Sequence, residues 1–108
     1  MEFEFIETDE FTEIIQELIG ENEYRLLQAT LIKRPDFGVV IPGGGGIRKL
    51  RWALREKGKS GGIRILYYLY LSAHQIYMLY TFKKSDQSDL NREELLMLAE
   101  YVKKHLKS

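Results

Sequence analysis

The chain has 108 residues, with 16 basic and 16 acidic side chains and no cysteine. This length predicts a single domain over residues 1–108, and the lack of cysteine excludes disulfides, thiolate metal sites and cysteine nucleophiles. The sequence has no apolar stretch near the roughly 20 residues that span a bilayer and no signal-peptide pattern, so we expect a cytoplasmic protein with no membrane partner.

The first third of the chain predicts a strand followed by two helices. Residues 2–6 alternate polar and apolar side chains, as a short strand does. Thr8 or Asp9 is suited to cap a helix that Gly20 would end. A second helix is predicted over about residues 22–33, because its apolar side chains share one face and a proline follows it.

The middle of the chain predicts a loop and then three strands. Residues 35–46 contain both prolines and five of the nine glycines, which is typical of a loop. The apolar period then changes from about 3.6 to about 2, which predicts consecutive antiparallel strands over residues 47–56, 62–71 and 75–83, with residues 2–6 at an edge. The last two strands are apolar on both faces, so we expect helices to cover them.

The last part of the chain predicts a helix. Asn91 and Glu94 match a capping box, and apolar residues at helical spacing form a stripe behind it: Leu95, Ala99, Val102 and Leu106. The order of elements predicts an α+β fold, in which the N-terminal strand and two helices pack on an antiparallel sheet and a C-terminal helix completes the domain.

Charge is distributed unevenly along this neutral chain. Residues 43–84 carry nine Lys and Arg against the single acid Glu56, whereas residues 1–42 carry ten acids against three bases. Strand alternation puts Lys49 and Arg51 on one face of the sheet. A positive sheet face without interspersed acids favours binding of a polyanion such as a nucleic acid.

Other motifs give weaker indications. Residues 53–60 fit a permissive P-loop pattern, but a glycine pair and a β-rich run follow where a phosphate-binding loop needs a helix. The glycine run at residues 43–46 is compatible with a phosphate cradle or with a flexible entry to a strand. His74 and His105 have no predicted contact with each other, and no ligand cluster indicates a metal site.

Several motifs together resemble those of the RelE/ParE toxin superfamily, most closely its HigB-like branch. The matching text includes Pro-x-x-Gly-x-x-Ile at residues 35–41, Gly-Gly-x-Arg-Lys-x-Arg at residues 45–51, and Gly-Lys-x-Gly-Gly-x-Arg at residues 58–64, followed by Tyr-Tyr. The last strand, a Lys-containing loop, Asp-Leu and the final helix also match, so that the resemblance covers about residues 20–106.

The resemblance implies a RelE-like microbial RNase fold and the toxin of a type II toxin–antitoxin system. Such a toxin is a ribosome-dependent mRNA endonuclease (an mRNA interferase), and we expect it to need neither metal nor cofactor. Its partners would be the ribosome, mRNA and a cognate antitoxin, for which a helix-turn-helix protein is expected. Two alternatives stay open: a ParE-like inhibitor of DNA gyrase that cuts nothing, and a non-catalytic RNA-binding module.

Matching positions give the expected site residues. Arg64 is the predicted phosphate clamp, because its planar guanidinium donates two hydrogen bonds at once, and Lys59 and Lys84 are predicted to transfer protons. The predicted RNA contacts are Lys49, Arg51 and Lys57 at matching positions, together with Arg48 and Lys83 from the basic run. The sequence departs from the family at two places: Asn91 lies near a position where some relatives carry Tyr, and Ser85 lies close to a position of Arg.

Overall fold

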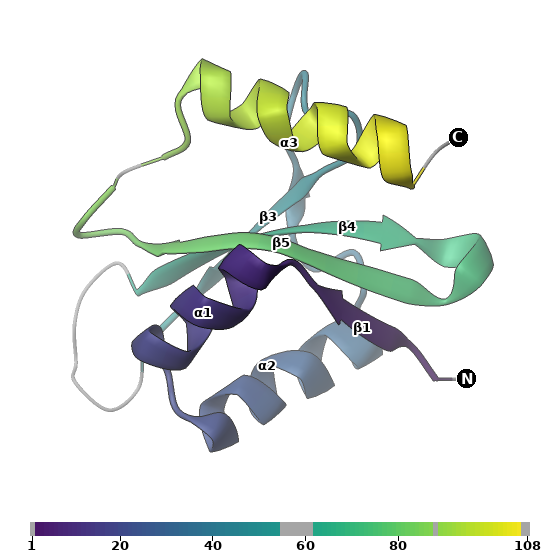
Figure 1. The fold of residues 1–108 in the computed structure, drawn as a ribbon. Helices are drawn as coiled ribbons and strands as arrows, with labels where there is room; N and C mark the ends of the chain where they lie inside the picture. Colours follow the sequence, from purple (N-terminus) through teal and green to yellow (C-terminus); the bar gives the residue numbers. More distant parts are fainter. Residues whose placement is uncertain (1, 55–61, 88, 107–108) are drawn as a thin grey trace.

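The computed structural model describes residues 2–54, 62–87 and 89–106. Helices cover both faces of a five-stranded sheet, α1 and α2 on one face and α3 on the other (Figure 1). The elements follow one another as β1 (Glu4–Glu7), α1 (Asp9–Leu18), α2 (Glu21–Lys33), β2 (Val39–Val40), β3 (Arg48–Trp52), β4 (Ile63–Tyr70), the 3-10 turn η1 (Leu71–Ala73), β5 (Gln75–Lys83) and α3 (Arg92–His105). The predicted α+β fold is confirmed.

The sheet is mixed rather than fully antiparallel. Its strand order is β1-β5-β4-β3-β2, and the three central strands pair antiparallel as predicted. β1 lies at an edge, as expected, but it runs parallel to β5. Parallel pairing is possible here because most of the chain, including two helices, separates these strands, whereas short connections favour antiparallel pairs.

Two strands differ from the prediction in length or existence. β2, which pairs with β3, lies inside the segment that was predicted to be a loop. Two residues between a proline and a glycine run carry no periodic signal, so the sequence could not indicate this strand. β3 ends at Trp52, before the predicted end at residue 56, and residues 55–61 lie outside the described part of the chain.

Each sheet face has its own apolar core. On one face, α1 and α2 bury Phe11, Ile15, Leu27 and Leu31 against β4 and β5. On the other face, α3 packs its residue Val102 over a second cluster that includes Leu66, Leu79 and Phe82. The sheet is therefore buried on both sides at its centre, which explains why β4 and β5 are apolar throughout.

A β-bulge interrupts the pairing of β4 with β5. Leu66 pairs with Tyr80, but the next residue, Tyr67, pairs with Met78, so Leu79 is an extra residue on β5. A bulge of this kind changes which side chains face which side of the sheet. It leaves Tyr80 on the face of α3 together with Leu79, an orientation that simple alternation from Met78 does not predict.

Side-chain caps fix the starts of two helices. The Thr8 hydroxyl accepts a hydrogen bond from the Phe11 amide at the start of α1. The predicted capping box at Asn91 and Glu94 is present at the start of α3. None of the helices within the described residues is long and apolar enough to cross a membrane.

Candidate nucleic-acid interface

Three cationic side chains come together on the sheet face that α3 partly covers. Lys49 and Arg51 belong to β3 and share a face by strand alternation. Arg51 pairs directly with Arg64 on β4, and directly opposed residues of antiparallel strands project from the same face, with roughly 5 Å between their Cβ atoms. We call Lys49, Arg51 and Arg64 the cationic face.

Arg64 is buried although it carries a charge. Its exposed fraction is 5%, and its backbone carbonyl accepts a hydrogen bond of 2.8 Å from the Thr81 hydroxyl. Burial lowers the pKa of the Arg64 guanidinium, the charge of Arg51 lowers it further, and Asp89 raises it in compensation. Like charges directly opposed on a sheet destabilise it, so a bound anion would relieve a cost that the fold carries at this pair.

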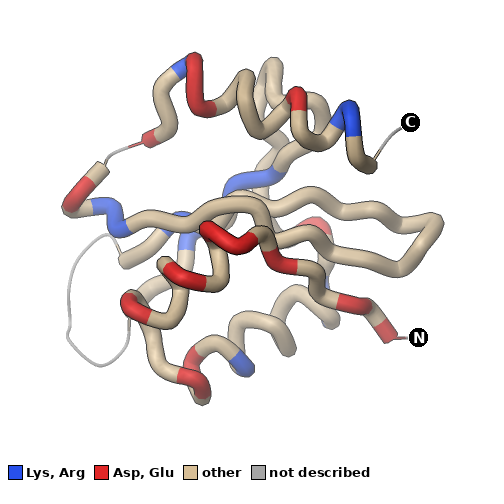
Figure 2. The backbone as a smooth tube through the Cα atoms, viewed as in Figure 1, with Lys and Arg blue, Asp and Glu red and all other residues tan. Residues whose placement is uncertain are grey.

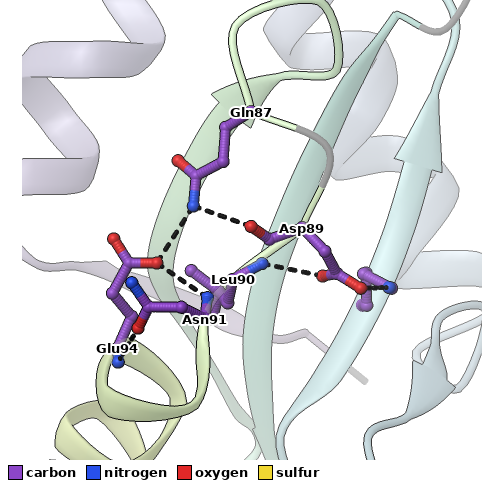
Figure 3. Close-up of polar contacts among 6 residues, drawn as sticks. Gln87, Asp89, Leu90, Asn91 and Glu94 are labelled. Carbon is purple, nitrogen blue, oxygen red and sulfur yellow. Dashed lines mark hydrogen bonds and ion pairs between the residues drawn. The ribbon is translucent and has the colours of Figure 1, made fainter.

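Asp89 supplies a carboxylate to the cationic face from the segment before α3. Its Oδ2 atom accepts a hydrogen bond of 2.9 Å from Lys49 Nζ, and its Oδ1 atom accepts one of 2.9 Å from the Leu90 amide. The Lys49 hydrogen bond is the main cause that lowers the pKa of Asp89, and the charge of Arg64 adds to it. Figure 3 shows the Asp89 side chain pointing away from α3 toward the strands.

A polar network holds the segment that carries Asp89. The Gln87 side-chain amide donates to the Asp89 carbonyl (2.9 Å) and to the Glu94 carboxylate (3.0 Å). Glu94 also accepts from the Asn91 amide, and Asn91 caps the Glu94 amide in return (Figure 3). The start of α3 therefore fixes where the Asp89 carboxylate lies.

Acidic and basic residues gather on different elements of the N-terminal part and the sheet. Acidic residues gather on β1, on α1 and at the start of α2, whereas cations mark β3 and the end of β5 (Figure 2). Two ion pairs join described residues to each other: Arg25 with Glu21, and Lys49 with Asp89. The acids of β1, α1 and α2 and the cations of β3 therefore lie on different elements of the fold.

A comparison of the sequence with protein families shows to which family the chain belongs. The model described as "RelE toxin of RelE / RelB toxin-antitoxin system" matches residues 25–108. The chain belongs to the RelE toxin family. Membership confirms the predicted superfamily and the predicted function of a toxin that cleaves mRNA on the ribosome, whereas the HigB-like branch stays a prediction.

A solved structure has the same fold as this RelE-family toxin. It is the E. coli toxin RelE, determined as a double arginine-to-alanine mutant in the free state. The TM-score is 0.60, the sequence identity is 15%, and the match covers 98% of this chain and 100% of that chain. At this identity the likeness shows a shared fold and does not identify site residues of this toxin.

Arg48 lies apart from the cationic face of the toxin. It belongs to the opposite side of β3, and its guanidinium donates hydrogen bonds to the carbonyls of Gly38 (2.7 Å) and Asp36 (3.4 Å). The Tyr67 hydroxyl holds the same loop, because it accepts from the Gly38 amide and donates to the Pro35 carbonyl. These contacts show that Arg48 stabilises the loop before β2. Its predicted contact with RNA would require the guanidinium to break its hydrogen bonds to Asp36 and Gly38.

The remaining predicted cations lie at the end of the sheet or outside the described residues. Lys83 pairs with Ile63, which faces α1 and α2, so it does not share the cationic face. Lys84 is exposed in the turn after β5, and its amide donates to the Gly62 carbonyl (3.0 Å). This contact places the Lys84 backbone beside the start of β4, two residues from Arg64. Lys57 and Lys59 lie outside the described part of the chain.

The glycine run has a packing role in the toxin. Gly43, Gly45 and Gly46 have positive φ angles. A Cβ atom on Gly44 would lie 3.3 Å from the Leu95 side chain of α3. This turn therefore packs closely against α3, and its conformation is explained without a bound phosphate.

The two histidines lie on separate elements. His74 follows η1 with a left-handed backbone (φ 55°) and contacts the Phe3 ring, whereas His105 contacts the Tyr101 ring on α3. Within the described residues there is no group of three or more His, Asp or Glu side chains that could hold a metal ion.

Sequence reasoning missed Asp89 as a site residue. Asp-Leu was recognised only as part of the family text, because neither periodicity nor charge shows that a residue before α3 reaches a lysine on β3. The orientation of Tyr80 could not be predicted either, because the bulge turns its side chain to the face of α3. Burial raises the pKa of the Tyr80 hydroxyl, and the charges of Glu94 and Glu10 raise it further.

Proposed function

We propose that the toxin binds the mRNA backbone on its cationic face and that Arg64 stabilises the phosphate at which the chain is cut. The observation that carries this proposal is the buried Arg64 directly opposite Arg51. The fold has to stabilise two like charges at this pair, and a phosphate diester is an anion that both guanidiniums can bind. Lys49 extends the same face along β3.

The proposed reaction uses the RNA's own 2′-hydroxyl as the nucleophile. This oxygen attacks the adjacent phosphorus, the bond to the 5′-oxygen of the next nucleotide breaks, and a 2′,3′-cyclic phosphate forms. The protein's contribution is to align these atoms and to stabilise the negative charge of the transition state. Arg64 and Arg51 supply the positive charge for this stabilisation, so the step as proposed needs no metal ion.

Proton transfer in this reaction has a proposed donor and acceptor among the lysines. One group must take the proton from the 2′-hydroxyl and another must give one to the leaving 5′-oxygen. Lys84 is the candidate within the described residues. Its backbone lies beside the start of β4, and it follows by two residues Phe82, the residue that pairs with Arg64. Lys59 is the second candidate and, with the proposed RNA contact Lys57, lies outside the described residues.

The partner that restrains the toxin follows from the family, and its kind is proposed. Membership implies an antitoxin, for which we propose a helix-turn-helix protein with a segment that is rich in Asp and Glu or in apolar residues. An acidic segment would match the cationic face, and its association would slow as salt rises. Because translating ribosomes are the proposed target, the proposed site of action is the cytoplasm.

The test is cleavage of mRNA by purified toxin on translating ribosomes, with cut sites mapped by primer extension. We expect cuts within the ribosomal A site and little cleavage of free mRNA. The activity should survive EDTA treatment when enough magnesium is restored to keep the ribosomes intact. Inhibition of DNA supercoiling by gyrase, with no cleavage of mRNA, would instead support the ParE-like alternative.

A further inference from the structure

The ion pair between Lys49 and Asp89 joins two segments that are far apart in the sequence. Its atoms are 2.9 Å apart, and the side chains are 31% and 55% exposed. A pair this open to solvent contributes little to the stability of a fold, so it is a weak structural device. The same openness makes Lys49 accessible to a dissolved anion.

The Asp89 carboxylate is held in place as an anion. One of its oxygens accepts from the Leu90 amide, so that the other is directed to Lys49 (Figure 3). The Gln87 side chain fixes the Asp89 backbone at its carbonyl. Because the lysine and the amide lower the pKa of Asp89, its carboxylate stays ionised at neutral pH and is a weak proton acceptor, which argues against a general-base role.

A carboxylate oxygen and a phosphate oxygen are interchangeable partners for a lysine. Both accept charge-assisted hydrogen bonds of about 2.7–2.9 Å from an ammonium group. Lys49 lies two residues from Arg51 on the same strand face, and Arg51 is directly opposite Arg64. An oxyanion at the position of the Asp89 carboxylate is therefore already bound as an RNA phosphate on this face would be.

We propose that the Asp89 carboxylate occupies a phosphate subsite of the cationic face, and that an RNA phosphate displaces it from Lys49 when RNA binds. This inference rests on the proposed function, since it assumes that RNA uses this face. It adds that Asp89 competes with an RNA phosphate for Lys49. This competition lowers the affinity of the toxin for RNA that makes no other contacts with it.

The test measures binding of RNA rather than cleavage. The probe is a fluorescent 2′-O-methyl oligoribonucleotide of mixed sequence, which has no 2′-hydroxyl to react, and binding is followed by anisotropy at several salt concentrations. Asp89→Asn keeps an oxygen for the Leu90 amide and removes the charge that holds Lys49. We expect binding about fivefold tighter than in the wild type, with a logarithmic salt slope steeper by about 0.7, the value for one additional ion pair with a single strand.

Asp86→Asn is the matched control, because Asp86 is an exposed acid of the same connection between β5 and α3. It removes the same charge without removing the partner of Lys49, so it should bind the probe with the salt slope of the wild type. The gain from Asp89→Asn should also vanish when Lys49→Gln is added. Unfolding midpoints in urea show whether each variant remains folded.

The outcomes separate this inference from the proposed function. If Asp89→Asn binds like Asp86→Asn, or more weakly than the wild type, or keeps its gain in the presence of Lys49→Gln, the subsite does not exist. In parallel, cleavage of mRNA by the wild-type toxin is measured on translating ribosomes. Loss of that cleavage would overturn the proposed function, whereas cleavage without an effect of Asp89 on binding would overturn only the inference.

Discussion

Arg51 and Arg64 are the residue pair on which the proposed binding of phosphate rests. Two guanidiniums directly opposed across β3 and β4 repel each other, and one of them is buried. A protein interior normally disfavours such a charge. The sequence predicted that Arg64 would bind a phosphate, and the strand register adds Arg51 as a second donor of the proposed phosphate site.

Tyr67 makes a residue-scale prediction about stability. Its buried hydroxyl is the partner of both the Gly38 amide (2.8 Å) and the Pro35 carbonyl (2.7 Å). Tyr67→Phe leaves both backbone groups without this partner, so we expect the free energy of unfolding to fall by roughly 1–3 kcal/mol. Urea unfolding measures this loss. Tyr70→Phe, on the same strand but half-buried, should change it little; equal losses in the two variants would contradict the assigned role.

The start of α3 is the element on which the candidate site depends. Asn91 caps the Glu94 amide, and the Glu94 carboxylate accepts from the Asn91 amide and from Gln87. This network joins the helix to the segment that presents Asp89. A shift of the first turn of α3 would therefore displace the Asp89 carboxylate from the cationic face.

The cap gives an element-scale prediction. Asn91→Ala removes the side-chain acceptor and should lower the free energy of unfolding by about 1 kcal/mol. Asn91→Ser, whose hydroxyl is also a good cap, should recover most of this loss. Thermal unfolding followed by circular dichroism measures both variants. A serine variant as unstable as the alanine variant would show that something other than capping stabilises this end of α3.

The elements also show what could and could not be predicted from the sequence. The strands β4 and β5 and the capping box of α3 were predicted because each is written in local periodicity or spacing. β2 is too short to show a pattern, and the parallel direction of β1 depends on a partner that is most of the chain away. The site followed the same rule: the cations were visible as a charge run, but the contact of Asp89 with Lys49 is long-range and was not.

At the scale of the whole molecule, the separation of charge should orient the toxin as it approaches RNA. Acids gather on β1, on α1 and at the start of α2, whereas cations lie on β3 (Figure 2). A field of this form attracts a polyanion to one side and repels it from the other. The neutral total charge of the chain conceals this property.

Salt dependence tests this orientation. In binding of the 2′-O-methyl oligoribonucleotide, Arg51→Gln should reduce the logarithmic salt slope by about 0.7, because one ion pair with a single strand is lost. Arg25→Gln removes an exposed arginine on α2 that forms an ion pair with Glu21 and lies outside the cationic face, so its slope should equal that of the wild type. Equal reductions in both variants would mean that net charge, rather than the cationic face, determines binding.

The most direct test of the central claim is the single-turnover rate of mRNA cleavage on ribosomes with a defined codon in the A site. Arg64→Ala should lower this rate by about 100-fold or more, the usual loss when a group that stabilises the transition state is removed. Arg25→Ala, a matched arginine outside the cationic face, should keep the wild-type rate. A folded Arg64→Ala variant that cleaves as fast as Arg25→Ala would contradict the assignment of the phosphate clamp.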